Sequence, residues 1–350
     1  MQIHIDDWVL DDLRRRLRAT RWPDEIPGVG WGQGAPVEWV RRLVSYWAEE
    51  FDWRAWEARL NKLDHVMWEG IHFVHQRRGG TPLVLTHGWP STFLDYLEVL
   101  PLLDEFDVVI PSLPGYGFSP RPSRAGLNYR YVTDRWHALM THLGYTRYGA
   151  AGGDFGGGVA TFLALDHPES LIGIHLTTPE LEPDVPDAEL SDVERAYVEV
   201  VHGWDRVERG YSAIQSTKPQ TVGYGLNDSP AGLAAYLGEK WYSWTDATPS
   251  DDFLCATFTL YWVTGSITSS MRDYWDNRWY RVEPTYVETP TAFGIFAHSK
   301  VDEGEPPRSY LERLYNVQRW TVFPHGGHFG PAERPADVAD DLTAFFRGLE

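Results

Sequence analysis

The sequence has 350 residues, which is long enough to bury one large core or two smaller ones. A formal net charge of −19 argues against nucleic acid and anionic membranes as partners, because both attract a basic face. The only cysteine cannot form an intramolecular disulfide, and acidic residues interrupt the first apolar stretch. We therefore expect a soluble, cytoplasmic protein that does not associate with membranes. The composition leaves open whether it forms a homodimer.

The first seventy residues contain two amphipathic helical patterns, at 11–19 and 37–50, with a Trp-rich loop between them. This segment has no apolar pattern for a core of its own. Residues 1–70 are therefore predicted to be an N-terminal meander that wraps the main domain.

From about residue 71 onward, short apolar runs alternate with helical patterns. Buried strands are predicted at 71–76, 83–86, 108–110, 148–151, 171–176, 292–297 and 320–323, and helices at 131–143, 157–165 and 335–346. This alternation predicts an α/β fold with a mostly parallel, doubly wound sheet, built from 71–180 and 286–350.

Residues 181–285 interrupt this rhythm. They contain helical patterns such as 191–202 and 253–261, and no clear buried strand. We expect a helical lid over the carboxyl edge of the sheet, which is where ligands bind in open α/β sheets.

The strongest local motif is the run AAGGDFGGG at 150–158, between a predicted strand and a predicted helix. Small residues on both sides of one reactive residue are typical of the nucleophile elbow in the α/β-hydrolase fold, here with Asp154 in place of serine. A plainer interpretation makes Asp154 the N-cap of a helix after a Gly-rich turn. The order of the motifs that follow favours the nucleophile.

The sequence HGWP at 87–90 directly follows the predicted strand 83–86. In this fold the loop after that strand donates one amide hydrogen of the oxyanion hole, and the residue after the nucleophile donates the other. The two donors would be the backbone amides of Trp89 and Phe155. Alone, the motif could also be a tight turn.

The fold requires the chain order nucleophile, acid, histidine. His328, in the sequence GGH after the last predicted strand, stands where the base should be. The acid should follow the strand at 292–297, where Asp302, Glu303 and Glu305 are all candidates to orient the imidazole.

An aspartate nucleophile restricts the reaction. A carboxylate displaces a leaving group at an sp³ carbon, and histidine-activated water then hydrolyses the resulting alkyl-enzyme ester. The leaving group could be an epoxide oxygen, which needs a proton donor, or a halide, which needs weak N–H donors.

At these motifs the sequence resembles the epoxide hydrolases of the microsomal and juvenile-hormone type, over nearly the whole chain. The most specific similarity lies in two lid stretches, GYSAIQSTKP at 210–219 and the stretch from YWVTG to SSMRDY at 261–274. The resemblance implies that Tyr211 and Tyr274 donate protons to the epoxide oxygen. Register with a Pro-Pro pair at 306–307 places the acid at Asp302, where many members have Glu.

The resemblance also implies the wall of the substrate pocket and the absence of any metal or cofactor. Residues expected to bind substrate are Trp89, Phe155, Pro90 and Trp262. Two positions depart from the family: Phe155, where Trp is frequent, and the Gly-Pro pair at 330–331.

These observations predict an epoxide hydrolase that forms a vicinal diol. The many aromatic residues favour a bulky apolar or aromatic small-molecule epoxide, such as an intermediate of secondary metabolism. The alternatives are a cyclase, in which an internal nucleophile of the substrate replaces water, and a non-catalytic binding protein on the same scaffold. A haloalkane dehalogenase fits less well, because two lid tyrosines and Phe155 suit halide poorly.

Overall fold

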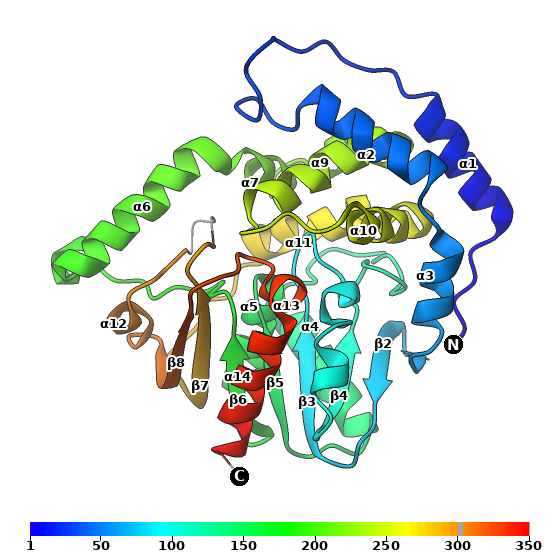
Figure 1. Ribbon diagram of the computed structural model, residues 1–350. Helices are drawn as coiled ribbons and strands as arrows, with labels where there is room; N and C mark the ends of the chain where they lie inside the picture. The colour runs from blue at the N-terminus through cyan, green and yellow to red at the C-terminus, as the bar shows by residue number, and fades with distance from the viewer. Residues whose placement is uncertain (300–303, 350) are drawn as a thin grey trace.

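The computed structural model describes residues 1–299 and 304–349, and its centre is an eight-stranded sheet (Figure 1). The strand order is β1-β2-β4-β3-β5-β6-β7-β8. β2 pairs antiparallel with both β1 and β4, and all other pairs are parallel. The strands are β1 His65–Trp68, β2 Ile71–Gln76, β3 Thr81–Thr86, β4 Phe106–Pro111, β5 Tyr148–Gly152, β6 Leu171–Leu176, β7 Val287–Phe296 and β8 Tyr315–Phe323.

All seven predicted strands are present, and two differences have local causes. β1 was not predicted, because it is a short edge strand whose side chains are only partly buried. β7 begins at Val287, five residues before the predicted start. The prediction started too late because Pro290 interrupts the apolar run. The register of β7 against β8 shifts between Val287 and Thr291, which accommodates the proline.

Helices cover both faces of the sheet. The helix α14 lies on one face, and α4 and α5 lie on the other (Figure 1). α5 is buried along almost its whole length, so the chain passes from the turn after β5 directly into the core. The helices and 3-10 turns around the sheet are α4 Tyr129–His142, α5 Phe155–Asp166, α12 Arg308–Leu311, α13 Gly330–Glu333, α14 Pro335–Arg347, η1 Phe93–Tyr96 and η2 Leu100–Leu102.

The predicted lid is helical throughout and sits over the end of the sheet where the parallel strands finish (Figure 1). α6 projects sideways from the rest of the lid. The lid elements are η3 Asp187–Glu189, α6 Asp192–Glu208, α7 Gly210–Gln215, α8 Pro219–Asp228, α9 Pro230–Ser243, α10 Asp251–Thr264 and α11 Ile267–Trp279.

The N-terminal helices pack against the lid. They are α1 Asp7–Arg18, α2 Val37–Glu49 and α3 Trp53–Leu60, and they contact α9 and α10. Two indole N–H groups donate across this contact, from Trp47 to the Thr259 hydroxyl and from Trp56 to the Asp252 carboxylate, each at 2.8 Å. The first segment of the chain thus holds the lid in place. Within 1–299 and 304–349, no helix has the length and apolarity needed to cross a bilayer.

Candidate active site

Asp154 lies in the turn between β5 and α5, where it is the N-cap of α5. Its φ of 53° and ψ of −136° fall in a region that residues other than glycine rarely adopt. The turn is possible because its neighbours lack side chains: a Cβ at Gly88 would overlap the Asp154 carboxylate, and one at Gly156 would overlap the Thr86 carbonyl. The glycines around Asp154 therefore allow β3 and α5 to approach it closely.

The two amides predicted for the oxyanion hole both point at the carboxylate. Oδ1 of Asp154 accepts hydrogen bonds from the backbone N–H of Trp89, at 3.1 Å, and of Phe155, at 2.5 Å. Pro90, which is buried, follows Trp89 through a cis peptide bond. One carboxylate oxygen is thus bound by two backbone N–H groups, and Oδ2 accepts neither of these bonds.

His328 faces that second oxygen, with its Nε2 3.4 Å from Oδ2 of Asp154. The loop that carries the imidazole is fastened to the lid, because the His328 N–H donates to the Trp244 carbonyl at 2.9 Å. The Glu333 carboxylate accepts from the backbone N–H groups of Gly327 and Phe329 on either side, at 3.0 and 3.2 Å. The backbone of the loop that carries the imidazole is therefore held on two sides, by the lid and by Glu333.

The acid of the triad falls where the chain is only partly described. Asp302 and Glu303 lie outside the described residues, so their assignment stays a prediction. Glu305 lies within them and its side chain is exposed.

Both predicted tyrosines approach the site from the lid, Tyr211 from α7 and Tyr274 from α11. Their ring centroids are 5.8 Å apart, and the indole of Trp89 packs against both, parallel to Tyr211 and edge-on to Tyr274. Phe155 also contacts Tyr274, at 4.8 Å between centroids. Burial raises the pKa of Tyr274 well above that of an ordinary phenol, so this group is a neutral donor.

Trp262 was expected to bind substrate, but it does not lie beside Asp154. It lies on α10, and its ring packs under the guanidinium of Arg16 on α1, 5.7 Å from the ring centroid. This contact belongs to the junction between the lid and the N-terminal helices, rather than to the surroundings of Asp154.

Three further residues at the site were not singled out from the sequence. Trp244 packs its ring against both Tyr211 and His328, with centroids 5.2 and 5.1 Å apart. The buried Lys240 places its ammonium 4.5 Å from the Tyr211 ring centroid and pairs with the neighbouring Glu239. The scarcity of lysine in this chain, with Lys240 one of four, was a signal that could have directed attention to it.

The third is Asp95 in η1, which is 4% exposed. Burial raises the pKa of its carboxyl to about 7. It lines a cavity of about 20 Å³ that it shares with Asp154, His328 and Ser91. That volume holds about one water molecule.

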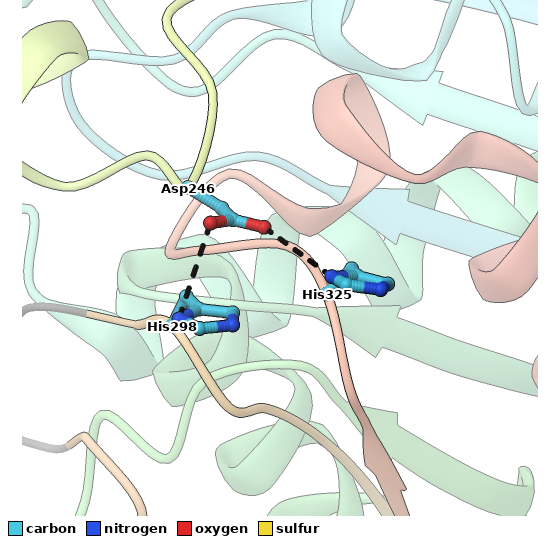
Figure 2. Close-up of side chains that lie close together, drawn as sticks. All are labelled: Asp246, His298 and His325. Carbon is cyan, nitrogen blue, oxygen red and sulfur yellow. Dashed lines mark ion pairs between the residues drawn. The ribbon is translucent and has the colours of Figure 1, made fainter.

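Among the described residues, one cluster of side chains outside this cavity has the chemistry of metal ligands. Figure 2 shows Asp246, from the lid segment after α9, between His298 and His325, which follow β7 and β8. Each histidine Nδ1 lies 3.9 Å from a carboxylate oxygen of Asp246. The cluster is exposed and does not line the cavity at Asp154.

The sheet order, the elbow at Asp154 and the histidine after the last strand define an α/β hydrolase. A family model described as "alpha/beta hydrolase fold" matches residues 81–220, and one described as "Epoxide hydrolase N terminus" matches residues 1–96. The chain belongs to the epoxide hydrolases. This confirms the predicted fold and enzyme class.

Relatives named as epoxide hydrolases match along most of their length. Epoxide hydrolase 1 of Sus scrofa is 31% identical, over 100% of this chain and 88% of the relative. Juvenile hormone epoxide hydrolase 2 of Ctenocephalides felis is 31% identical, over 97% and 83%. The solved structure of Aspergillus niger epoxide hydrolase is 28% identical with a TM-score of 0.88, and the match covers 100% of this chain and 96% of that one.

Proposed function

We propose that this epoxide hydrolase forms a vicinal diol in two steps, through a covalent ester on Asp154. In the first step Oδ2 of Asp154 attacks an epoxide carbon, and the C–O bond of the ring breaks. The developing alkoxide takes a proton from Tyr211 or Tyr274, the two tyrosines that the lid brings to this site. The observation that carries the proposal is the division of the carboxylate, with Oδ1 held by two amides and Oδ2 facing His328.

In the second step His328 takes a proton from water, and the water oxygen bonds to Cγ of Asp154. The negative charge collects on Oδ1, where the amides of Trp89 and Phe155 already point. Collapse expels the diol oxygen, which is protonated by the imidazolium. The carboxyl proton left on Asp154 replaces the one lost by the tyrosine, so the net reaction is epoxide plus water to diol.

The proposed substrate is a bulky apolar or aromatic epoxide. Five aromatic rings pack against one another between the elbow and the lid, those of Trp89, Phe155, Tyr211, Tyr274 and Trp244. Rings of this kind supply apolar contact area while their polar edges reach the epoxide oxygen. A panel of aryl, terpenoid and small aliphatic epoxides, compared by kcat/KM, tests this preference.

Isotope labelling tests the ester mechanism. In a single turnover in ¹⁸O water with enzyme in excess, the first diol should carry unlabelled oxygen from the enzyme, and the Asp154 peptide should gain ¹⁸O. If the label appears in that first diol, water attacks the epoxide directly and the covalent mechanism is wrong.

A further inference from the structure

We infer that Asp95 and Ser91 form, together with His328, a buried site for the water molecule that cleaves the Asp154 ester. The inference rests on the proposed covalent mechanism. Its starting point is the cavity of about 20 Å³ beside the nucleophile, which is large enough for one water and lined by all four side chains.

The Asp95 carboxyl is held at one oxygen and offers the other. Oδ2 is hydrogen-bonded to the Ser91 hydroxyl, while Oδ1 is buried and has no hydrogen-bond partner among residues 1–299 and 304–349. Leaving a buried carboxyl oxygen unpaired is unfavourable, so a buried polar atom of this kind usually binds water. The cavity next to Asp95 is the place where such a water fits.

The hydrolytic step needs what this site supplies. The attacking water must give one hydrogen to His328 and turn a lone pair toward Cγ of Asp154. Its second hydrogen then needs an acceptor, and Oδ1 of Asp95 accepts whether the carboxyl is ionised or carries its proton on Oδ2. Asp95 thus orients the water while His328 takes its proton.

Separating the two half-reactions tests this role. Wild type and Asp95→Asn would be mixed with styrene oxide or trans-stilbene oxide, quenched rapidly, and analysed by intact-protein mass spectrometry. The amide presents N–H groups to the water and competes for the lone pair that must attack. We expect alkylation within about twofold of wild type, ester hydrolysis slowed roughly 10–10²-fold, and a fall in KM together with kcat as the ester accumulates.

Asp107→Asn is the matched control, because Asp107 is also a buried carboxylate but lies on β4 and binds the Tyr145 hydroxyl and two backbone amides. Asp107→Asn should leave the ratio of the alkylation rate to the ester-hydrolysis rate unchanged. Ser91→Ala, which loosens Oδ2 of Asp95, should slow hydrolysis selectively but less, and it serves as the test if Asp95→Asn does not fold. Hydrolysis at the wild-type rate in the folded variants overturns the water site, whereas absence of any ester in wild type and His328→Gln overturns the covalent mechanism itself.

An independent observation carries a second inference: the geometry points to a divalent transition-metal site formed by Asp246, His298 and His325 (Figure 2). Their ligand atoms lie within 4.8 Å of one another, and ligands around a tetrahedral zinc ion stand about 3.3 Å apart. The histidine side chains are 45% and 66% exposed, so they can close this gap by rotation. The carboxylate is already oriented by the Gly326 N–H, which donates to Oδ2 at 3.1 Å.

An ion at this site would join the lid to the two core loops that follow β7 and β8. Untagged protein would be titrated with ZnCl₂ by calorimetry and with CoCl₂ by visible absorption. We expect one ion per chain, binding at least tenfold more weakly in His325→Ala and in His298→Ala, and unchanged binding in His202→Ala, which removes an exposed histidine of α6. Absence of binding, or equal binding in the His298→Ala/His325→Ala double variant, overturns the site.

Discussion

The two walls of the active site are built in different ways. On the core side, hydrogen bonds of the backbone hold the functional residues. Asp154 lies in a strained turn, its Oδ1 accepts from two amides, and the His328 loop donates two amide N–H groups to Glu333. On the lid side, Tyr211 and Tyr274 are placed by ring packing against Trp89 and its neighbours. The core wall thus holds its functional groups through hydrogen bonds of the backbone, whereas the lid wall holds the two tyrosines, which are the proposed proton donors, through contacts between rings.

The largest expected effect is on the core wall. In the proposed mechanism His328 acts only in the second step. His328→Gln should therefore still open the epoxide once and then stall, with turnover reduced roughly 10³-fold. Intact-protein mass spectrometry should show one substrate mass per chain, mapped to the Asp154 peptide. Promptly tested Asp154→Asn should show no adduct. Normal turnover, or a folded variant that is never alkylated, would remove His328 from the role of base.

Variants of the lid wall should slow the first step, alkylation, rather than hydrolysis of the ester. Tyr274→Phe or Tyr211→Phe removes one donor to the epoxide oxygen, so alkylation should slow roughly 10²-fold while hydrolysis of ester already formed stays near the wild-type rate. The double variant should be nearly inactive. Rapid-quench kinetics measures both rates, and unchanged alkylation in Tyr274→Phe would contradict the assignment. If core and lid variants slow the same step, the division between the two walls is wrong.

A smaller effect is expected for the acid of the triad. Asp302→Asn should lower turnover about tenfold, since backbone contacts still hold the His328 loop when the acid is gone. Glu303→Gln and Glu305→Gln should have less effect. Steady-state kinetics of the three amides decides between them, and an equal or larger loss in Glu303→Gln would move the role there.

The smallest effect concerns stability. Burial raises the pKa of Asp95 to about 7, so the folded state binds this proton more tightly than the unfolded chain, where the pKa is about 3.9. Wild type should therefore lose stability as the pH rises from about 4 to about 7, and Asp95→Asn lacks this loss. The shift sets an upper limit of about 4 kcal/mol, and we expect ~1 kcal/mol in favour of the variant at pH 8 relative to pH 4.5.

Urea denaturation of both proteins at the two pH values measures this change. Asp107→Asn is again the control, because hydrogen bonds to that carboxylate lower its pKa. A difference between wild type and Asp95→Asn that does not vary with pH would contradict the raised pKa.

The sequence predicted best what is local. The elbow at Asp154 and the loop at Trp89 depend on neighbouring residues, so a short motif contains them, and the apolar strands stand out because both of their faces are buried. Edge strand β1 escaped prediction because its burial is partial.

Three residues of the site were not predicted from the sequence, because only folding brings them together: Asp95, Lys240 and Trp244. Asp95 lies in an apolar stretch, Phe93–Tyr96, that reads as an ordinary turn, and nothing local indicates that the fold brings it beside His328. Lys240 contacts the ring of Tyr211 on α7, and Trp244 contacts the ring of His328 in the loop after β8. The lid tyrosines were found only through a family resemblance, since periodicity does not distinguish them among 18 tyrosines.

The hydrogen bond from the His328 amide to the Trp244 carbonyl makes that amide a natural reporter of lid motion. Its deuterium exchange requires the segment after α9 to separate from the base loop. Should substrate entry leave this bond intact, the His328 amide would stay protected while amides in α7 and α11 exchange. The lid would then stay attached next to His328 and separate from the core at α7 and α11.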